Sequence, residues 1–112
     1  MDIKITTEVI LSQLGYSQNE HILAQADEII KNTKGFNDFS KHLISLNDNL
    51  KHMHAYIALS NSEKYFKIKC DENDSDAIVE EFDEKVNHFS KKYHVNIRKL
   101  ENKNVYYILG KD

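Results

Sequence analysis

A change in hydrophobic spacing near Lys51 constrains the fold of this chain more than any other feature. Before Lys51, apolar residues recur at steps of three and four, which is the spacing of an amphipathic helix. After it, Met53, Ala55, Ile57 and Leu59 alternate with other residues, which is the spacing of a strand with one buried face. The pattern therefore predicts an α+β fold in which N-terminal helices precede the strands.

Two to three helices are expected before this change. Thr6 or Thr7 can cap a short first helix that ends at Gly15. Ser17 and Glu20 form the capping-box pattern of a second helix. The third helix carries large apolar side chains at steps of three and four: Phe36, Phe39, Leu43, Leu46 and Leu50. Such a seam usually packs against other helices of the same domain, and less often forms a dimer interface.

The second half of the chain reads as two strands, a helix and two strands. The central helix, from Ser75 to Tyr93, has one apolar stripe, made of Ile78, Val79, Phe82, Val86, Phe89 and Tyr93. Strand patterns from Tyr65 to Cys70, from Val95 and from Val105 to Leu109 surround this helix. Short polar turns separate the members of each strand pair, so each pair is expected to form a hairpin. The prediction is a ββαββ unit with a small, mainly antiparallel four-stranded sheet.

The length of 112 residues fits one domain. We expect residues 1–112 to form a single domain, with a helical part at about 1–52 and a ββαββ part at about 53–112. The alternative is an N-terminal three-helix subdomain hinged near Lys51. Ile3 to Ile5 reads either as a short strand or as a leader.

One face of the predicted sheet collects basic and aromatic side chains. Residues two apart on a strand project to the same side of a sheet. Four apolar residues are expected to face the central helix: Ile57, Phe66, Ile68 and Val105. The opposite face then carries the candidate binding residues, which are His54, Tyr56, Tyr65, Lys67, Lys69, Arg98 and Tyr106. The N-terminal helices could instead cover this face.

These residues favour binding over catalysis. The chain has no glycine-rich phosphate loop, and no nucleophile or paired-carboxylate motif stands out, so we expect no enzyme. The main hypothesis is a small protein–protein interaction domain, an adaptor, inhibitor or regulatory subunit, that binds through the exposed sheet face or a sheet edge. The alternative is a single-stranded nucleic-acid-binding module, because cations can contact phosphates and flat rings can stack on bases. The net charge of −3 argues against a general polyanion binder.

No metal site or cofactor is predicted. His52 and His54 would share one side of a strand, a spacing found in metal sites, but no third ligand can be assigned. The acidic segment from Asp71 to Asp76 resembles the start of a calcium loop, yet Asp76 stands where the loop requires glycine. Cys70 falls on the apolar side of its strand and is expected to be a core residue.

Two features bear on partners and location. Tyr106 to Leu109 is a nearly continuous apolar run, which indicates a strand buried on both faces or one that pairs with another chain. A homodimer is therefore a candidate assembly, beside an unidentified protein partner. No run approaches the ~20 apolar residues that span a bilayer, so no membrane partner is expected. A single cysteine and the absence of a signal-peptide pattern favour a cytoplasmic location.

Overall fold

The computed structural model describes residues 6–70, 75–101 and 103–111, so Ile3 to Ile5 and the acidic residues 71–74 lie outside the described residues. Three helices come first: α1 (Thr7–Gln13), α2 (Glu20–Asn32) and α3 (Phe36–Leu50), followed by a 3₁₀ turn, η1 (Lys51–Met53). The second half contains β1 (Ala55–Leu59), β2 (Phe66–Cys70), α4 (Asp76–Tyr93), β3 (Val95–Lys99) and β4 (Val105–Lys111). The predicted α+β fold, with N-terminal helices followed by ββαββ, is confirmed.

Side chains cap three of these helices at their first turn. Thr6 caps α1, and Ser75 caps α4 by accepting a hydrogen bond from the Ile78 amide. The predicted capping box of α2 is wrong, because the side chain of Asn19 is the cap and accepts from the Ile22 amide at 2.9 Å. Glu20 is then the first helical residue, whereas a capping box requires the acidic residue at the third helical position.

The four strands form one sheet in the order β1-β2-β4-β3. Every neighbouring pair is antiparallel, and both predicted hairpins, β1–β2 and β3–β4, are present. The two hairpins join through β2 and β4, with Lys67 opposite Tyr107 and Phe66 opposite Ile108. Because β4 lies inside the sheet, the apolar run from Tyr106 to Leu109 is covered within the chain, and this supports the first of its two explanations.

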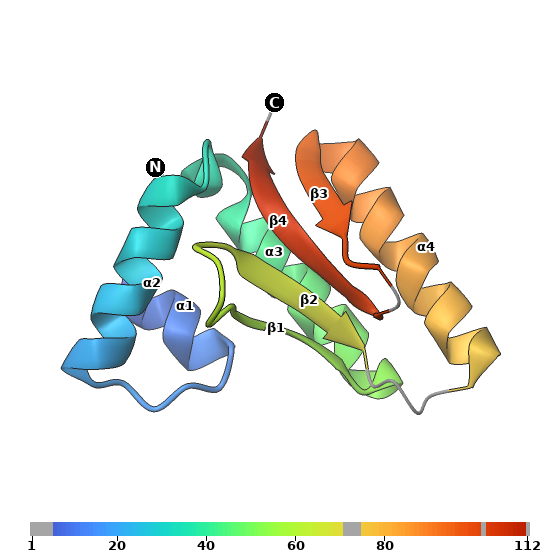
Figure 1. The fold of residues 1–112 in the computed structure, drawn as a ribbon, viewed down its shortest axis with the longest axis horizontal. Coiled ribbons are helices and arrows are strands. Elements are labelled where there is room, and N and C mark those ends of the chain that lie inside the picture. The colour runs from blue at the N-terminus through green and yellow to red at the C-terminus, as the bar shows by residue number, and fades with distance from the viewer. Residues whose placement is uncertain (1–5, 71–74, 102, 112) are drawn as a thin grey trace.

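Helices α3 and α4 cover one face of the sheet, and α1 and α2 lie beyond the β1 edge (Figure 1). Three aromatic pairs connect these layers: Phe36 stacks on Phe66, Phe39 meets Phe89, and Phe82 meets Tyr106. Most buried apolar side chains form one hydrophobic cluster with members in all of the helices and strands, including Cys70 and the predicted seam of α3. The prediction that Cys70 is a core residue is therefore confirmed.

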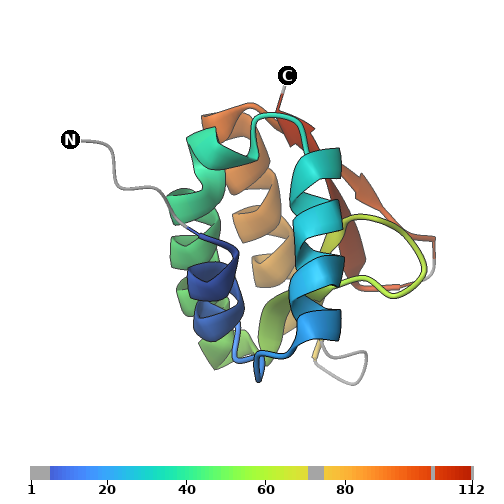
Figure 2. The ribbon, with the colours of Figure 1, turned by 90° about the vertical axis from the view of Figure 1, so that its left-hand side faces the viewer.

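The opposite face of the sheet has no described helix over it (Figures 1 and 2). In Figure 2 the strands of the sheet lie along the right-hand side of the view, and no helix lies to the right of them. The N-terminal helices therefore do not cover the predicted binding face. They pack at its margin instead.

Candidate functional site: the open face of the sheet

The candidate site is the side of the sheet turned away from α3 and α4. We call it the open face, and its members are Tyr56, Ala58, Tyr65, Lys67, Lys69, Arg98, Val105 and Tyr107. Strand register places them together, since Tyr56 pairs with Lys69 and Tyr107 pairs with both Lys67 and Arg98. Of the predicted site residues, Tyr56, Tyr65, Lys67, Lys69 and Arg98 lie here. The structure therefore brings most of the predicted surface together.

Tyr106 lies on the other face of the sheet, contrary to the prediction. Its hydroxyl donates to Asp83 on α4 at 2.7 Å, and only 5% of the residue is exposed. Burial and the Asp83 carboxylate raise the pKa of Tyr106 to about 12. Because side chains alternate along a strand, Val105 and Tyr107 then occupy the open face. The expectation that Val105 faces the helix is wrong for the same reason.

His54 is not part of the sheet either. It ends η1 in the left-handed conformation, with φ of 56°, and β1 begins at the next residue. His52 lies inside η1, where its Nε2 is 3.7 Å from the Glu81 carboxylate. The two imidazoles therefore do not share one side of a strand as expected. Within the described ranges, no group of three or more His, Cys, Asp or Glu side chains is placed to hold a metal ion.

Tyr107 is the central residue that the sequence analysis missed. Only 7% of it is exposed, because its ring lies 5.6 Å from the Tyr65 ring and 5.5 Å from the Arg98 guanidinium. Its hydroxyl is 3.0 Å from Ser62 Oγ. Hydrogen bonding to Ser62 and Ser60 lowers the pKa of Tyr107. The neighbouring residues in β4 are apolar, so the sequence does not indicate which of them face outward.

The open face is electrostatically one-sided. None of the four described strands contains an Asp or a Glu, whereas Lys67, Lys69 and Arg98 all project from the open face. Among the described residues, Lys67 and Lys69 form no ion pair. Exposed carboxylates are concentrated on α4 instead, at Asp76, Glu80, Glu81 and Glu84. Glu63, in the loop between β1 and β2, acts electrostatically on Tyr107.

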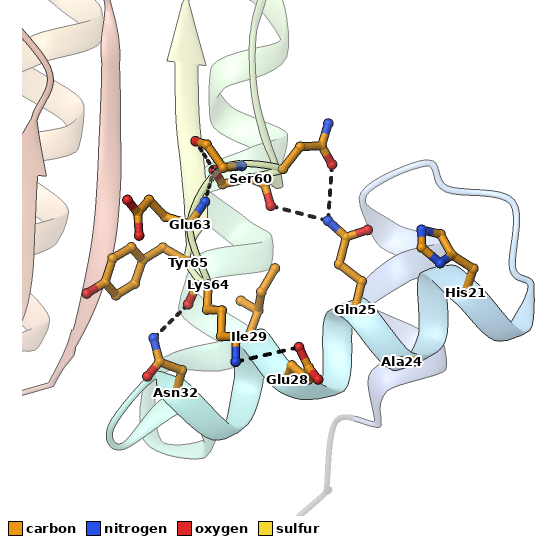
Figure 3. Close-up of a pocket in the computed structure, with 12 residues that line it drawn as sticks. His21, Ala24, Gln25, Glu28, Ile29, Asn32, Ser60, Glu63, Lys64 and Tyr65 are labelled. Atoms are coloured by element: carbon orange, nitrogen blue, oxygen red, sulfur yellow. Dashed lines mark hydrogen bonds and ion pairs between the residues drawn. The ribbon is translucent and has the colours of Figure 1, made fainter.

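That loop forms two hollows, one on each side. On the open face, it bounds a hollow of about 220 Å³ with Lys67, Lys69, Lys103 and Tyr107 among its lining residues. On the other side, a wider groove of about 800 Å³ separates the loop from α2 (Figure 3). Polar contacts cross this wider groove, so α2 holds the loop from behind.

Side chains close the β1 edge of the sheet. The Ile57 amide donates to Asn47 Oδ1 at 2.9 Å, and the Leu59 amide donates to the Tyr16 hydroxyl at 2.9 Å. These are backbone donors that an added strand would need. Of the predicted binding routes, the β1 edge is therefore the least accessible. The open face and the β3 edge remain.

Comparisons with known proteins leave the function to be argued from this geometry. No protein-family model, curated protein or solved structure was found to match the chain. Among the described helices, none combines the length and the apolar character needed to cross a membrane.

Proposed function

We propose that this chain is a small, non-enzymatic protein–protein interaction domain that binds an acidic segment of a protein partner through the open face. The observation that carries the proposal is the sign of the charges: Lys67, Lys69 and Arg98 project from strands that contain no Asp or Glu. A surface of one sign attracts a partner of the other sign and fixes how that partner docks. The chain would then act as an adaptor, inhibitor or regulatory subunit.

Tyr56 supplies the apolar contact that such an interface needs. It is 45% exposed and pairs across the strands with Lys69, so ring and cation lie side by side on the open face. Tyrosine and arginine are both enriched in the centres of protein interfaces, and the open face carries Tyr56 and Arg98. The closed β1 edge supports docking on the face rather than strand addition at that edge.

Single-stranded nucleic acid is the second candidate, favoured by the same pairing of Tyr56 with Lys69. Base recognition on a sheet needs several ring faces on which bases stack. The Tyr107 ring is largely covered by Tyr65 and Arg98, and Tyr106 lies on the other face of the sheet. Fewer rings are thus available than the sequence suggests. This geometry favours an acidic protein segment over nucleic acid.

A cytoplasmic location and the absence of catalysis belong to the same proposal. Cys70 is the single cysteine and is buried, so the chain contains no internal disulfide, as suits a reducing compartment. The residues that line the hollow on the open face include Lys, Ser and Tyr. Side chains of these types can bind an anion without catalysing a reaction, so they support a binding role. A homodimer stays a candidate assembly, to be checked by light scattering over a range of concentrations.

The test measures fluorescence anisotropy of two labelled probes: a short peptide of alternating Glu and Gly, and a single-stranded oligonucleotide of mixed sequence. We expect the acidic peptide to bind the full-length protein, and the double variant Lys67→Gln with Lys69→Gln to weaken binding about tenfold or more, since hydrogen bonds to charged groups contribute about 1.5–3 kcal/mol each. The matched control is Lys31→Gln with Lys91→Gln, which removes the same charge from exposed helix positions.

Three outcomes would contradict the proposal. The acidic peptide could fail to bind at about 50 mM salt, where exposed charges are weakly screened. Both double variants could weaken binding equally, which would indicate a response to net charge rather than to the open face. Tighter binding of the oligonucleotide, lost on Tyr56→Ala, would instead establish the nucleic-acid alternative.

A further inference from the structure

The hollow on the open face is small and has a defined wall. Its volume is about 220 Å³, below the ~300–1,000 Å³ typical of sites that enclose whole small molecules. Ser60 and Ser62 line it on the loop side, and Tyr107 lies on the sheet side. A hollow of this size suits one chemical group of a larger partner rather than a free cofactor.

The loop that forms this wall is anchored at several points. Ser60 Oγ accepts from the amides of Ser62 and Glu63 at 3.4 and 3.3 Å, which makes a compact turn. Ser62 Oγ lies 3.0 Å from the Tyr107 hydroxyl and so joins the turn to β4. The position of the two serine hydroxyls is therefore set by contacts within the chain.

Helix α2 holds the same loop from the opposite side (Figure 3). Gln25 Nε2 donates to the Ser60 carbonyl at 3.2 Å and to Asn61 Oδ1 at 3.1 Å. Asn32 Nδ2 donates to the Lys64 carbonyl at 2.8 Å, and Lys64 Nζ lies 3.9 Å from Glu28 Oε2. These contacts come from a helix that is packed into the core through Ala26 and Ile29. Contacts on both sides therefore fix the conformation of this loop before a partner binds.

Positive charge converges on the hollow. Lys67, Lys69 and Lys103 all line it, and within the described residues none of the three forms an ion pair. Three neighbouring ammonium groups repel one another, so an anion between them would be stabilised. Glu63 in the loop lines the groove on the other side but acts electrostatically on Tyr107, which lines the hollow, so its carboxylate would oppose an anion bound there.

We propose that this hollow binds the phosphate group of a phosphorylated Ser or Thr side chain on the protein partner. The inference rests on the proposed function and names the group that the open face recognises. A phosphorylated side chain carries about −1.5 to −2 charges and three strong acceptor oxygens, whereas a carboxylate carries one charge and two oxygens. Lysine is an established phosphate ligand, and Lys67, Lys69 and Lys103, which line the hollow, can donate to the phosphate oxygens. The hollow thus matches phosphate better than carboxylate.

The experiment compares three labelled peptides that differ at one central position, which is phosphoserine, glutamate or serine in an otherwise identical sequence of Gly and Glu. We expect the phosphoserine peptide to bind about tenfold more tightly than the glutamate peptide, an effect equivalent to one additional charge-assisted hydrogen bond. Lys103→Gln should remove this preference while leaving the affinity for the glutamate peptide within about twofold, because Lys103 lies in the hollow and outside the strands. Glu63→Gln should strengthen phosphoserine binding.

The outcomes separate this inference from the proposed function. Equal affinity for the phosphoserine and glutamate peptides would overturn the phosphate site and leave acidic docking intact. Failure of all the peptides would overturn both. A phosphoserine preference that survives Lys103→Gln would place phosphate binding elsewhere and also refute the site. A 5′-phosphorylated dinucleotide that binds more tightly than the phosphoserine peptide would reassign the hollow to nucleic acid. Thermal unfolding of each variant shows whether the fold is retained.

Discussion

Asn47 provides the sharpest test of how the β1 edge is closed. It lies on α3, is only 4% exposed, and its Oδ1 accepts the Ile57 amide at 2.9 Å. Asn47→Ala would leave that amide without its partner, which costs about 1–3 kcal/mol for a buried donor. A gain in helix propensity of about 0.6 kcal/mol opposes this loss, because alanine is the better helix former. We therefore expect a net destabilisation of about 0.5–2.5 kcal/mol.

The expected effect on melting temperature follows from the chain length of 112 residues. With an unfolding entropy of about 2.1 cal/mol/K per residue, the whole chain has about 0.24 kcal/mol/K, so about 0.5–2.5 kcal/mol corresponds to about 2–10 °C. Calorimetry measures this shift, and hydrogen exchange measures the loss of protection at the Ile57 amide. Asn49→Ala is the matched control, because Asn49 is exposed on the same helix and shares the propensity gain.

Melting temperatures of Asn47→Ala and Asn49→Ala within about 1 °C of each other would contradict this role of Asn47, since the gain in helix propensity is common to both variants. Unchanged exchange at Ile57 would contradict it independently. Either result would mean that water or another group satisfies this amide. The β1 edge would then be more accessible than we infer, and strand addition would return as a binding route.

Three further predictions concern single side chains or backbone positions. Tyr106 keeps its proton to about pH 12, whereas an unfolded tyrosine ionises near pH 10, so the free energy of unfolding should fall as pH rises from about 10 to about 12. Urea unfolding of Tyr106→Phe should show a weaker decline over this pH range, and an unchanged decline would contradict the prediction. Gly110→Ala should lower the free energy of unfolding by about 1–3 kcal/mol, because φ is +133° and an added Cβ would lie 2.9 Å from the Lys34 amide nitrogen. An unchanged midpoint of urea unfolding would refute this prediction. Tyr16→Phe should lower the unfolding free energy by about 1 kcal/mol through loss of its hydrogen bond to the Leu59 amide, and a neutral result would show that this hydroxyl is dispensable.

The layout of helices and strands could be predicted because most elements carry a clear period. The stripe of α4 faces the core at Phe82, Val86 and Phe89, as its spacing indicates. In β2, lysines alternate with buried apolar residues, so Lys67 and Lys69 could be placed on the outward face. Where polar and apolar residues alternate strictly, the sequence alone determines which side chains face outward.

The errors arose where that alternation is missing. From Val105 to Ile108 every residue of β4 is buried, so the sequence contains no polar position that distinguishes its two faces. The pairing of Lys67 with Tyr107 decides the matter, and that contact joins residues from different hairpins. His54 was misplaced because a left-handed turn ends η1 just before β1, and a histidine carries no glycine-like signal for such a turn. Strand order and the supporting role of α2 behind the β1–β2 loop also depend on contacts between distant segments.

The most direct test of the central claim is to map the open face by NMR. Amide chemical shifts of the nitrogen-labelled full-length protein would be recorded while the peptide of alternating Glu and Gly is added. We predict that the largest shifts fall on β2 and its neighbours on the open face, at Lys67, Lys69 and Arg98, while the exposed side of α4 is unaffected. Shifts confined to the helices, or none on the open face at saturating peptide, would contradict the proposal that this surface binds an acidic partner.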